Sequence, residues 1–146
     1  GARMVELPEL LSESDFVTLH SPLTPETTSM MGVAELGKMK AEAFLINAAR
    51  GPLINEDALY DALTSGQIAG AGLDVLVDLA PPLDHRLVQL DNVIVTPHTA
   101  FFSQEAVLEL EERAAGEVAK VLRGEMPDNP VNPEVLSHSR ATIQGT

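Results

Sequence analysis

The chain has 146 residues, and its 45% hydrophobic content is enough to fill the core of one ordinary domain, which argues against a disordered polymer. Acidic residues outnumber basic residues by 22 to 9, and the resulting net charge of −13 opposes broad contact with nucleic-acid phosphates. The sequence contains no cysteine, so disulfides, thiolate metal sites and a cysteine nucleophile are excluded.

Short apolar runs alternate with stretches of helical periodicity. Asn55 can cap the start of one helix and Gly66 can end it, while Ser103 and Gly124 do the same for the last helix. This alternation predicts a parallel sheet with crossover helices, so the expected fold class is α/β, with about half of a doubly wound sheet. In chain order we expect a helix over 7–12, a strand over 16–19, a helix over 33–39, a strand over 43–47, a helix over 55–65, strands over 68–74 and 92–96, and a helix over 103–123.

The sequence after Gly124 is rich in proline and has little periodicity. Such a segment indicates that the chain leaves the domain or crosses its surface. We therefore expect residues 1–125 to belong to one domain and residues 126–146 to form a tail that returns towards another domain.

Polar residues follow directly after each expected strand. Right-handed crossovers place the loops after parallel strands along one edge of a sheet, where such folds bind ligands. We expect the polar residues of these loops to meet at that edge. They are His20 and Ser21, residues 47–50, Asp74 and His98.

Arg50 and His98 are the main candidates for chemistry. Arg50 precedes Gly51 in a turn, and its guanidinium could hold the carboxylate and adjacent keto oxygen of a small acid; the alternative is a surface arginine at a strand end. The imidazole of His98 suits proton transfer to a carbonyl oxygen; the alternative is a structural histidine.

Asp74 and the loop over 20–27 each have two interpretations. The carboxylate of Asp74 could accept a hydrogen bond from an amide group of a ligand, or it could bond to neighbouring backbone. The loop His-Ser-Pro-Leu-Thr-Pro-Glu-Thr has short side chains that leave room for a flat ligand, or it is a simple turn that ends a strand.

Four segments occur in a characteristic order. They are His-Ser-Pro-Leu-Thr-Pro-Glu-Thr at 20–27, Asn-Ala-Ala-Arg-Gly-Pro-Leu-Ile-Asn-Glu-Asp-Ala-Leu at 47–59, Gly-Ala-Gly-Leu-Asp-Val at 70–75, and Val-Thr-Pro-His-Thr-Ala-Phe at 95–101. Together they resemble the D-isomer-specific 2-hydroxyacid dehydrogenase family over about residues 6–135. The segment Thr-Ala-Phe-Phe-Ser-Gln-Glu-Ala after His98 is similar to the branch of C-terminal-binding proteins.

The resemblance implies the second half of a Rossmann NAD-binding domain in an oxidoreductase that interconverts 2-oxo and 2-hydroxy acids. It implies NAD as the cofactor, with NADP not excluded. Arg50 would bind the substrate carboxylate and carbonyl, and His98 would be the catalytic acid and base. The residues that the resemblance places beside the cofactor are Ser21, Thr27, Ala48, Ala49, Arg50, Asp74, His98, Thr99 and Ala100.

Two departures from the family pattern lead to further expectations. Leu79 stands where the family has a glutamate that pairs with the catalytic histidine, and the neighbouring Asp78 does not face the same way in an extended chain. The family's Gly-x-Gly-x-x-Gly loop, which cradles the cofactor pyrophosphate, does not occur in these residues. We therefore expect this chain alone to be inactive and to bind NAD weakly or not at all. The alternative is a non-catalytic, corepressor-like module that retains the fold.

The expected partners follow from the same features. The resemblance implies a small 2-oxo or 2-hydroxy acid, and half of a doubly wound sheet exposes an edge and apolar faces that favour a homodimer or higher oligomer. No apolar run approaches the roughly 20 residues of a membrane helix, and no secretory signal begins the sequence. We expect a cytoplasmic protein that binds neither membranes nor nucleic acid.

Overall fold

The computed structural model describes residues 1–134 in two compact units. The first unit is Gly1–Ala100, and the second begins at Phe101. Part of the tail expected over 126–146 lies outside the described residues. The expected division between residues 1–125 and 126–146 concerns the domains of a whole protein and stays a prediction.

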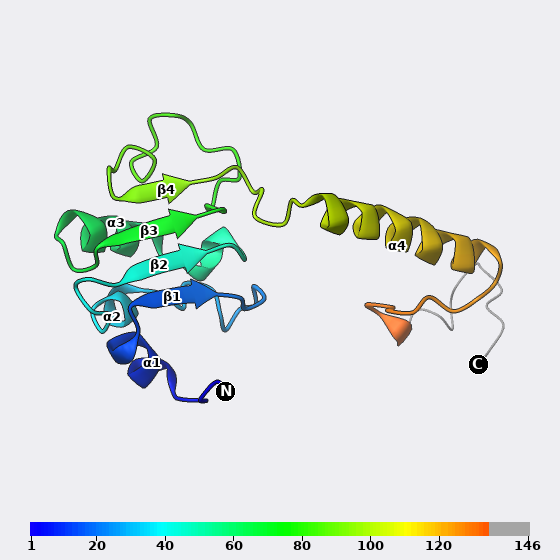
Figure 1. The fold of residues 1–146 in the computed structure, drawn as a ribbon, viewed down its shortest axis with the longest axis horizontal. Helices are drawn as coiled ribbons and strands as arrows, with labels where there is room; N and C mark the ends of the chain where they lie inside the picture. The colour runs from blue at the N-terminus through cyan, green and yellow to red at the C-terminus, as the bar shows by residue number, and fades with distance from the viewer. Residues whose placement is uncertain (135–146) are drawn as a thin grey trace. The chain divides into compact units, whose positions relative to one another are not determined.

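A four-stranded parallel sheet forms the centre of the first unit (Figure 1). Its strands are β1 (Phe16–Leu19), β2 (Phe44–Asn47), β3 (Gly70–Leu73) and β4 (Val93–Val95), and they lie side by side in chain order. In the register, Phe16 pairs with Phe44, Phe44 with Gly70, and Ala71 with Val93. Every expected strand is present and the α/β fold class is confirmed.

The helices of the first unit form in the expected places. They are α1 (Leu7–Glu13), α2 (Val33–Leu36) and α3 (Glu56–Thr64), with a short 3-10 turn η1 (Gly51–Leu53) before α3. The helix expected over 33–39 is shorter than predicted, because it ends at Leu36 with Gly37 as its C-cap. The side chain of Asn55 caps α3 by accepting from the amide of Ala58 at 3.0 Å. Gly66 follows the helix with a φ of 75°, the left-handed conformation expected at its end.

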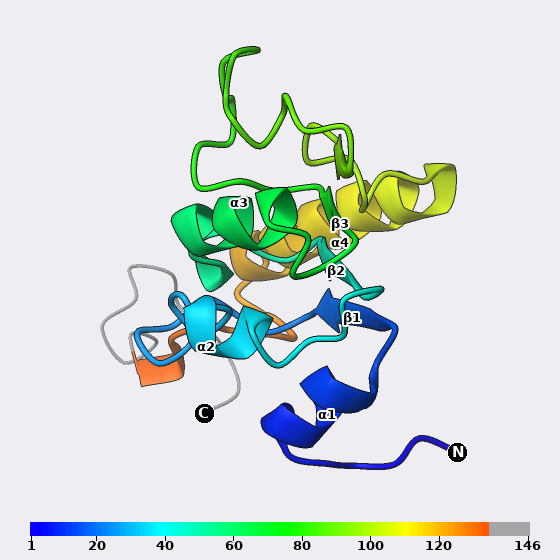
Figure 2. The same cartoon turned by 90° about the vertical axis from the view of Figure 1, so that its left-hand side faces the viewer.

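One face of the sheet carries the core. Figure 2 shows α2 and α3 side by side over this face, and these two helices are in contact. Leu45 and Leu73 of the strands and Leu59 of α3 are among the fully buried side chains between the layers. A sheet whose strands follow one another in a single direction places all of its right-handed crossovers on one side, which accounts for this arrangement.

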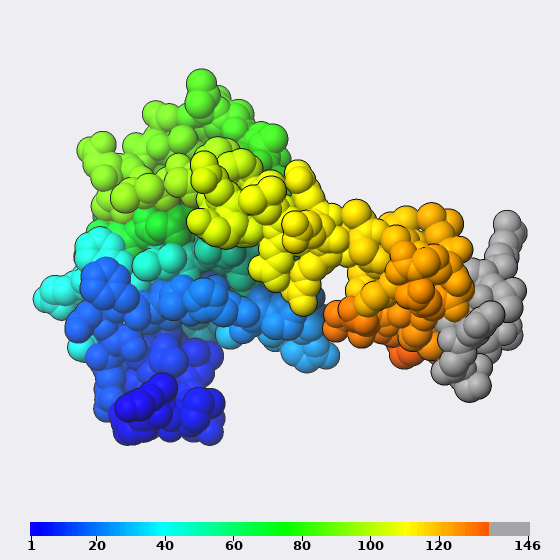
Figure 3. All heavy atoms as spheres, turned by 45° about the vertical axis from the view of Figure 1, so that its right-hand side comes forward, coloured from blue at the N-terminus to red at the C-terminus, as the bar shows by residue number. Residues whose placement is uncertain are grey.

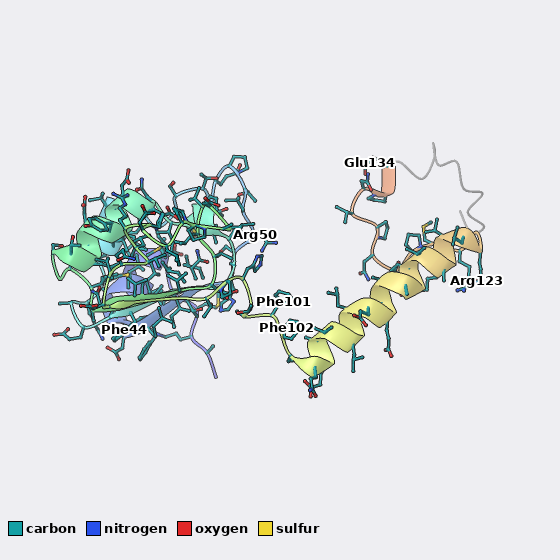
Figure 4. All side chains as sticks on the ribbon, turned by 90° about the horizontal axis from the view of Figure 1, so that it is seen from above. Phe44, Arg50, Phe101, Phe102, Arg123 and Glu134 are labelled. Carbon is teal, nitrogen blue, oxygen red and sulfur yellow. The ribbon has the colours of Figure 1, made fainter. Side chains whose placement is uncertain are left out.

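The other face of the sheet is apolar and has no helix of the first unit over it. Phe16 and Phe44 stack with their ring centroids 5.5 Å apart, and Ile94 is 73% exposed. Figure 4 shows Phe44 on the side of the sheet away from the helices of this unit. Strand residues therefore alternate between a buried side and an exposed side, although both are largely apolar.

The second unit contains α4 (Gln104–Leu122), the long helix expected over 103–123. The hydroxyl of Ser103 accepts from the amide of Ala106 at 3.1 Å, and Gly124 ends the helix with a φ of 75°. No residue of α4 is buried within this unit. Figure 3 shows α4 in yellow to orange and the first unit in blue to green. Among residues 1–134 no helix is long and apolar enough to cross a bilayer.

Candidate functional site

Two groups of the expected site residues lie at the carboxyl edge of the sheet. The first group comes from the loops after β1 and β2 and surrounds a hollow of about 590 Å³. The second comes from the end of β3 and the loop after β4. The backbone connects them, since the amide of Asp74 donates to the carbonyl oxygen of Asn47 at 2.9 Å.

The hollow brings together two short segments that are at least 25 positions apart in the sequence. It is lined by His20, Ser21, Pro22 and Leu23 from the loop after β1 and by Ala48, Ala49 and Arg50 from the loop after β2. The loop after β1 is tied to η1 because the amide of Ser29 donates to the carbonyl oxygen of Pro52 at 2.8 Å. The side chains of Ala48 and Ala49 are small and so occupy little of the hollow.

Asn47 holds the turn that carries Arg50. Its side chain is completely buried, donates to the carbonyl oxygen of Arg50 at 2.9 Å and accepts from the amide of Ala49 at 3.1 Å. A buried amide that is bonded at both ends fixes the backbone of the turn between its partners. Sequence reasoning named Asn47 only as one of several polar residues after a strand, and the pattern of residue types offers no signal for this role.

Gly51 permits a close approach between two loops. A Cβ atom at this position would lie 2.1 Å from the backbone carbon and oxygen of Leu76. Glycine is therefore required for packing against the chain that follows β3, and the turn of Arg50 rests on that chain.

The guanidinium of Arg50 is exposed and turned towards its own backbone. Its Nη1 atom donates to the carbonyl oxygen of Ala49 at 2.7 Å. Figure 4 shows Arg50 at the loop end of the sheet. Because the group has five donors in a planar fork, it retains donors for a carboxylate that enters the hollow.

Asp74 organises the second group. Its side chain is 6% exposed, and one oxygen accepts from the hydroxyl of Thr96 and from the amide of Thr99 at 2.8 Å. The other oxygen accepts from the amide of Ala100 at 2.9 Å. Of the two interpretations of Asp74, bonding to nearby polypeptide is therefore present, and a bond to a ligand amide stays a prediction.

His98 lies inside the loop that Asp74 holds. Its φ of 55° is in the left-handed region, which is uncommon for a residue other than glycine, and its amide donates to the carbonyl oxygen of Asp74 at 2.9 Å. Such backbone conformations often occur at functional sites. The side chain of His98 is exposed at the same edge of the sheet as Arg50.

Hydrogen bonds lower the pKa of the Asp74 carboxyl group. Burial raises its pKa, but the hydrogen bonds from Thr96, Ala100 and Thr99, together with the charge of His98, outweigh burial and leave the pKa below its ordinary value of 3.8. A carboxylate with three protein donors is suited to holding a loop.

Replacing Asp74 by Asn is expected to lower the free energy of unfolding by about 1–3 kcal/mol at neutral pH, because the amide cannot accept from all three donors. A lowered pKa contributes stability that is complete above the unfolded value of 3.8 and is lost as the pH falls through the folded value. The difference between the two proteins should therefore be constant at neutral pH and shrink below pH 3.8. Urea unfolding across this range measures it, and a difference that does not change with pH would contradict the assignment.

Thr27 and Leu79 have different surroundings. The hydroxyl of Thr27 donates to the carbonyl oxygen of Pro22 at 2.7 Å and accepts from the amide of Thr24 at 2.8 Å, so it is bonded within its own loop.

Leu79 is 63% exposed and lies with Asp78 beside an apolar cavity of about 370 Å³. The carboxylate of Asp78 accepts from the amide of Ala80 at 2.9 Å. Residues 1–134 contain no cluster of three His, Asp or Glu side chains that could hold a metal ion.

Comparison with known proteins gives consistent matches. The model of the D-isomer specific 2-hydroxyacid dehydrogenase NAD binding domain matches residues 1–100. Glyoxylate reductase of Korarchaeum cryptofilum is 46% identical over 136 residues, which are 93% of this chain and 41% of that protein.

Solved structures support the fold and the cofactor class. The NAD complex of a D-isomer specific 2-hydroxyacid dehydrogenase from Lactobacillus delbrueckii ssp. bulgaricus matches with a TM-score of 0.79 and 34% identity, covering 87% of this chain and 43% of that one. A family member from Xanthobacter autotrophicus Py2, solved with NADPH and MES, matches with a TM-score of 0.74 and 38% identity, covering 88% and 52%. The chain thus spans about half the length of these proteins or less.

Proposed function

The chain belongs to the D-isomer-specific 2-hydroxyacid dehydrogenase family, and on that basis we propose that residues 1–100 form the substrate-facing half of an NAD(P)-dependent domain that reduces a small 2-oxo acid. The observation that carries this proposal is the position of Arg50 and His98 in the loops after β2 and β4, at the carboxyl edge of one sheet, where Asp74 after β3 donates to Asn47 and accepts from the amide of His98. A cation that binds a carboxylate and an imidazole that supplies a proton are the two groups that such a reduction needs from the protein.

Each of the two residues has a distinct role in the proposal. The guanidinium of Arg50 binds the carboxylate and the neighbouring carbonyl oxygen, which orients and polarises the carbonyl group. The reduced nicotinamide supplies a hydride to the carbonyl carbon when the cofactor is bound. His98 donates a proton from its ring to the carbonyl oxygen as the negative charge develops there, and it accepts that proton in the reverse direction.

The cofactor lies along both loops in this proposal. Its nicotinamide end contacts the hollow and the loop of His98. The proposal covers both NAD and NADP, since it assigns no residue that selects between them. Because no Gly-x-Gly-x-x-Gly segment is present in these 146 residues, this chain alone binds the cofactor weakly and turns over little substrate. The proposed contacts are Ser21, Thr27, Ala48, Ala49, Arg50, Asp74, His98, Thr99 and Ala100.

A chimera tests the proposed function. In it, this chain replaces the matching 41% of Korarchaeum cryptofilum glyoxylate reductase, so that the remainder of the recipient supplies the missing part of the cofactor site. We expect the chimera to oxidise NADH or NADPH when glyoxylate, pyruvate or hydroxypyruvate is added. A folded chimera that binds the cofactor and reduces none of these acids would contradict the proposal.

Leu79 is expected to limit the rate of the chimera. Replacing Leu79 by Glu should raise kcat by about tenfold, because a carboxylate that pairs with the histidine orients the ring, and such supporting groups are typically worth about 10–100-fold. Leu83, which is 86% exposed in the same connection, provides the matched control: Leu83→Glu adds the same charge and should leave kcat unchanged. Equal effects of the two substitutions would show that charge alone, and not position, is responsible.

Leu79 also favours a second candidate function, a non-catalytic interaction module that retains the dehydrogenase fold. This candidate predicts that the chimera fails to turn over even with the Leu79→Glu substitution, although it still folds and binds NADH. Gain of turnover on that substitution would exclude it.

We also propose that the chain self-associates and resides in the cytoplasm. The exposed side chains of Phe16 and Ile94, on a sheet face that no helix of the first unit covers, support the first part. Light scattering at micromolar concentration should give the mass of a dimer or larger assembly. A monomeric mass would contradict the proposed oligomer without affecting the enzymatic proposal.

A further inference from the structure

Asp74 reaches from the end of β3 to a loop that begins more than twenty residues later. Its two carboxylate oxygens accept from Thr96, Thr99 and Ala100, and its carbonyl oxygen accepts from the amide of His98. Donors on both sides of His98 are therefore held by one residue that directly follows the neighbouring strand β3. We propose that Asp74 is a positioning residue, which holds the backbone of His98 in the conformation that presents the imidazole to the substrate.

The backbone of His98 needs such support. Its φ of 55° is unfavourable for any residue that has a Cβ atom. His98 directly follows Pro97 in the chain. A conformation of this kind persists only where surrounding contacts determine it. The amides of Thr99 and Ala100 directly follow His98 in the chain and donate to the charged carboxylate of Asp74. These hydrogen bonds restrain the backbone beside His98 and so oppose a change of its φ to a more favourable value.

This role is separate from the cofactor contact proposed for Asp74 above, and the two roles have different kinetic consequences. A residue that binds the cofactor alters the affinity for NADH when it is replaced, whereas a residue that positions His98 alters the proton-transfer step. The inference rests on the proposed function in that His98 is the acid. The hydrogen bonds and the conformation of the loop can nevertheless be tested without any turnover.

The first test is amide hydrogen exchange on the full chain by NMR. Asp74→Asn keeps the size of the side chain, and we expect the amides of Thr99 and Ala100 to exchange at least about tenfold faster in this variant. In the unmodified chain, the amide proton shifts of both residues should also titrate with the Asp74 carboxyl group in acid. The proposal would be overturned if the exchange rates and amide proton shifts of Thr99 and Ala100 in Asp74→Asn were the same as in the unmodified chain.

A second variant and a matched control guard against general unfolding. Thr96→Val removes one donor to Asp74, and it should accelerate exchange at Thr99 and Ala100 by a smaller factor. Glu56 is a carboxylate that accepts from the amide of Val77 at 2.7 Å on another loop. Glu56→Gln should accelerate exchange at Val77 and leave the loop of His98 unchanged, whereas an effect on that loop as large as that of Asp74→Asn would overturn the proposal.

Kinetics of the chimera test the consequence for His98. We expect Asp74→Asn to lower kcat by about 100-fold, the effect of a catalytic group displaced by about 1 Å, and to change the Kd for NADH by a much smaller factor. A weaker affinity for NADH with unchanged kcat would overturn the positioning role and assign Asp74 to the cofactor. If the unmodified chimera has no turnover, the proposed function fails, and the exchange measurements still decide whether Asp74 holds the loop.

Discussion

The chimera with His98 replaced by Asn should reduce 2-oxo acids with a kcat that is lower by about 10²–10⁴-fold, the usual contribution of a positioned general acid. Asparagine retains polarity and approximate size, but it has no proton to transfer near neutral pH. The exposed side chain of His98 makes few demands on the core, so we expect little change in the free energy of unfolding.

Two measurements accompany this prediction. Steady-state rates give kcat, and calorimetric titration gives the Kd for NADH, which should change far less than kcat. A kcat within about threefold of the unmodified value would remove His98 from the mechanism and favour the structural interpretation of this histidine.

Replacement of Arg50 by Ala should lower kcat/KM for the 2-oxo acid by about 10²–10³-fold. Loss of one partner from a desolvated charge pair costs about 2–5 kcal/mol, and each 1.4 kcal/mol corresponds to a factor of ten. The guanidinium is exposed and donates to the carbonyl oxygen of Ala49, whereas the side chain of Asn47 holds the turn, so removal of the guanidinium should not disturb it.

Arg3 provides a matched control for charge. It forms exposed ion pairs with Glu9 and Glu13, which contribute little to stability. Arg3→Ala removes the same charge and should leave kcat/KM unchanged. Equal losses in Arg50→Ala and Arg3→Ala would indicate a general electrostatic effect and contradict a carboxylate site at Arg50.

Most of the fold could be predicted from the sequence because local signals mark its elements. Apolar runs bounded by polar residues identified all four strands, and the strand over 16–19 matches β1 residue for residue. Capping residues identified the ends of the helices, as Asn55 and Gly66 show for α3. Boundaries of buried strands were less accurate: the run over 68–74 extends beyond β3, because apolar residues continue into the loops that pack beside it.

The location of the site could also be predicted, because parallel topology brings strand ends to one edge. His20, Ser21 and Arg50 do meet around one hollow. Their roles towards a substrate or cofactor remain predictions, and so does that of Thr27, whose hydroxyl is bonded within its own loop.

The contacts that hold the site could not be predicted in the same way. Asp74 bonds to residues 22–26 positions later, and its donors include backbone amides that any residue type provides. The left-handed backbone of His98 could not be predicted either, because the residue type does not distinguish a histidine in this conformation from a histidine in a strand. Such features depend on the distance between loops in space, and residue types along the chain carry little information about it.

The most direct test of the central claim is a crystal structure of the chimera with NADH and oxamate, a 2-oxo acid analogue that cannot be reduced. We predict that the guanidinium of Arg50 leaves the carbonyl oxygen of Ala49 and binds the carboxylate of oxamate. A ring nitrogen of His98 should lie within hydrogen-bond distance of the carbonyl oxygen. Oxamate bound elsewhere, or bound in this hollow without contacting Arg50 and His98, would contradict the account.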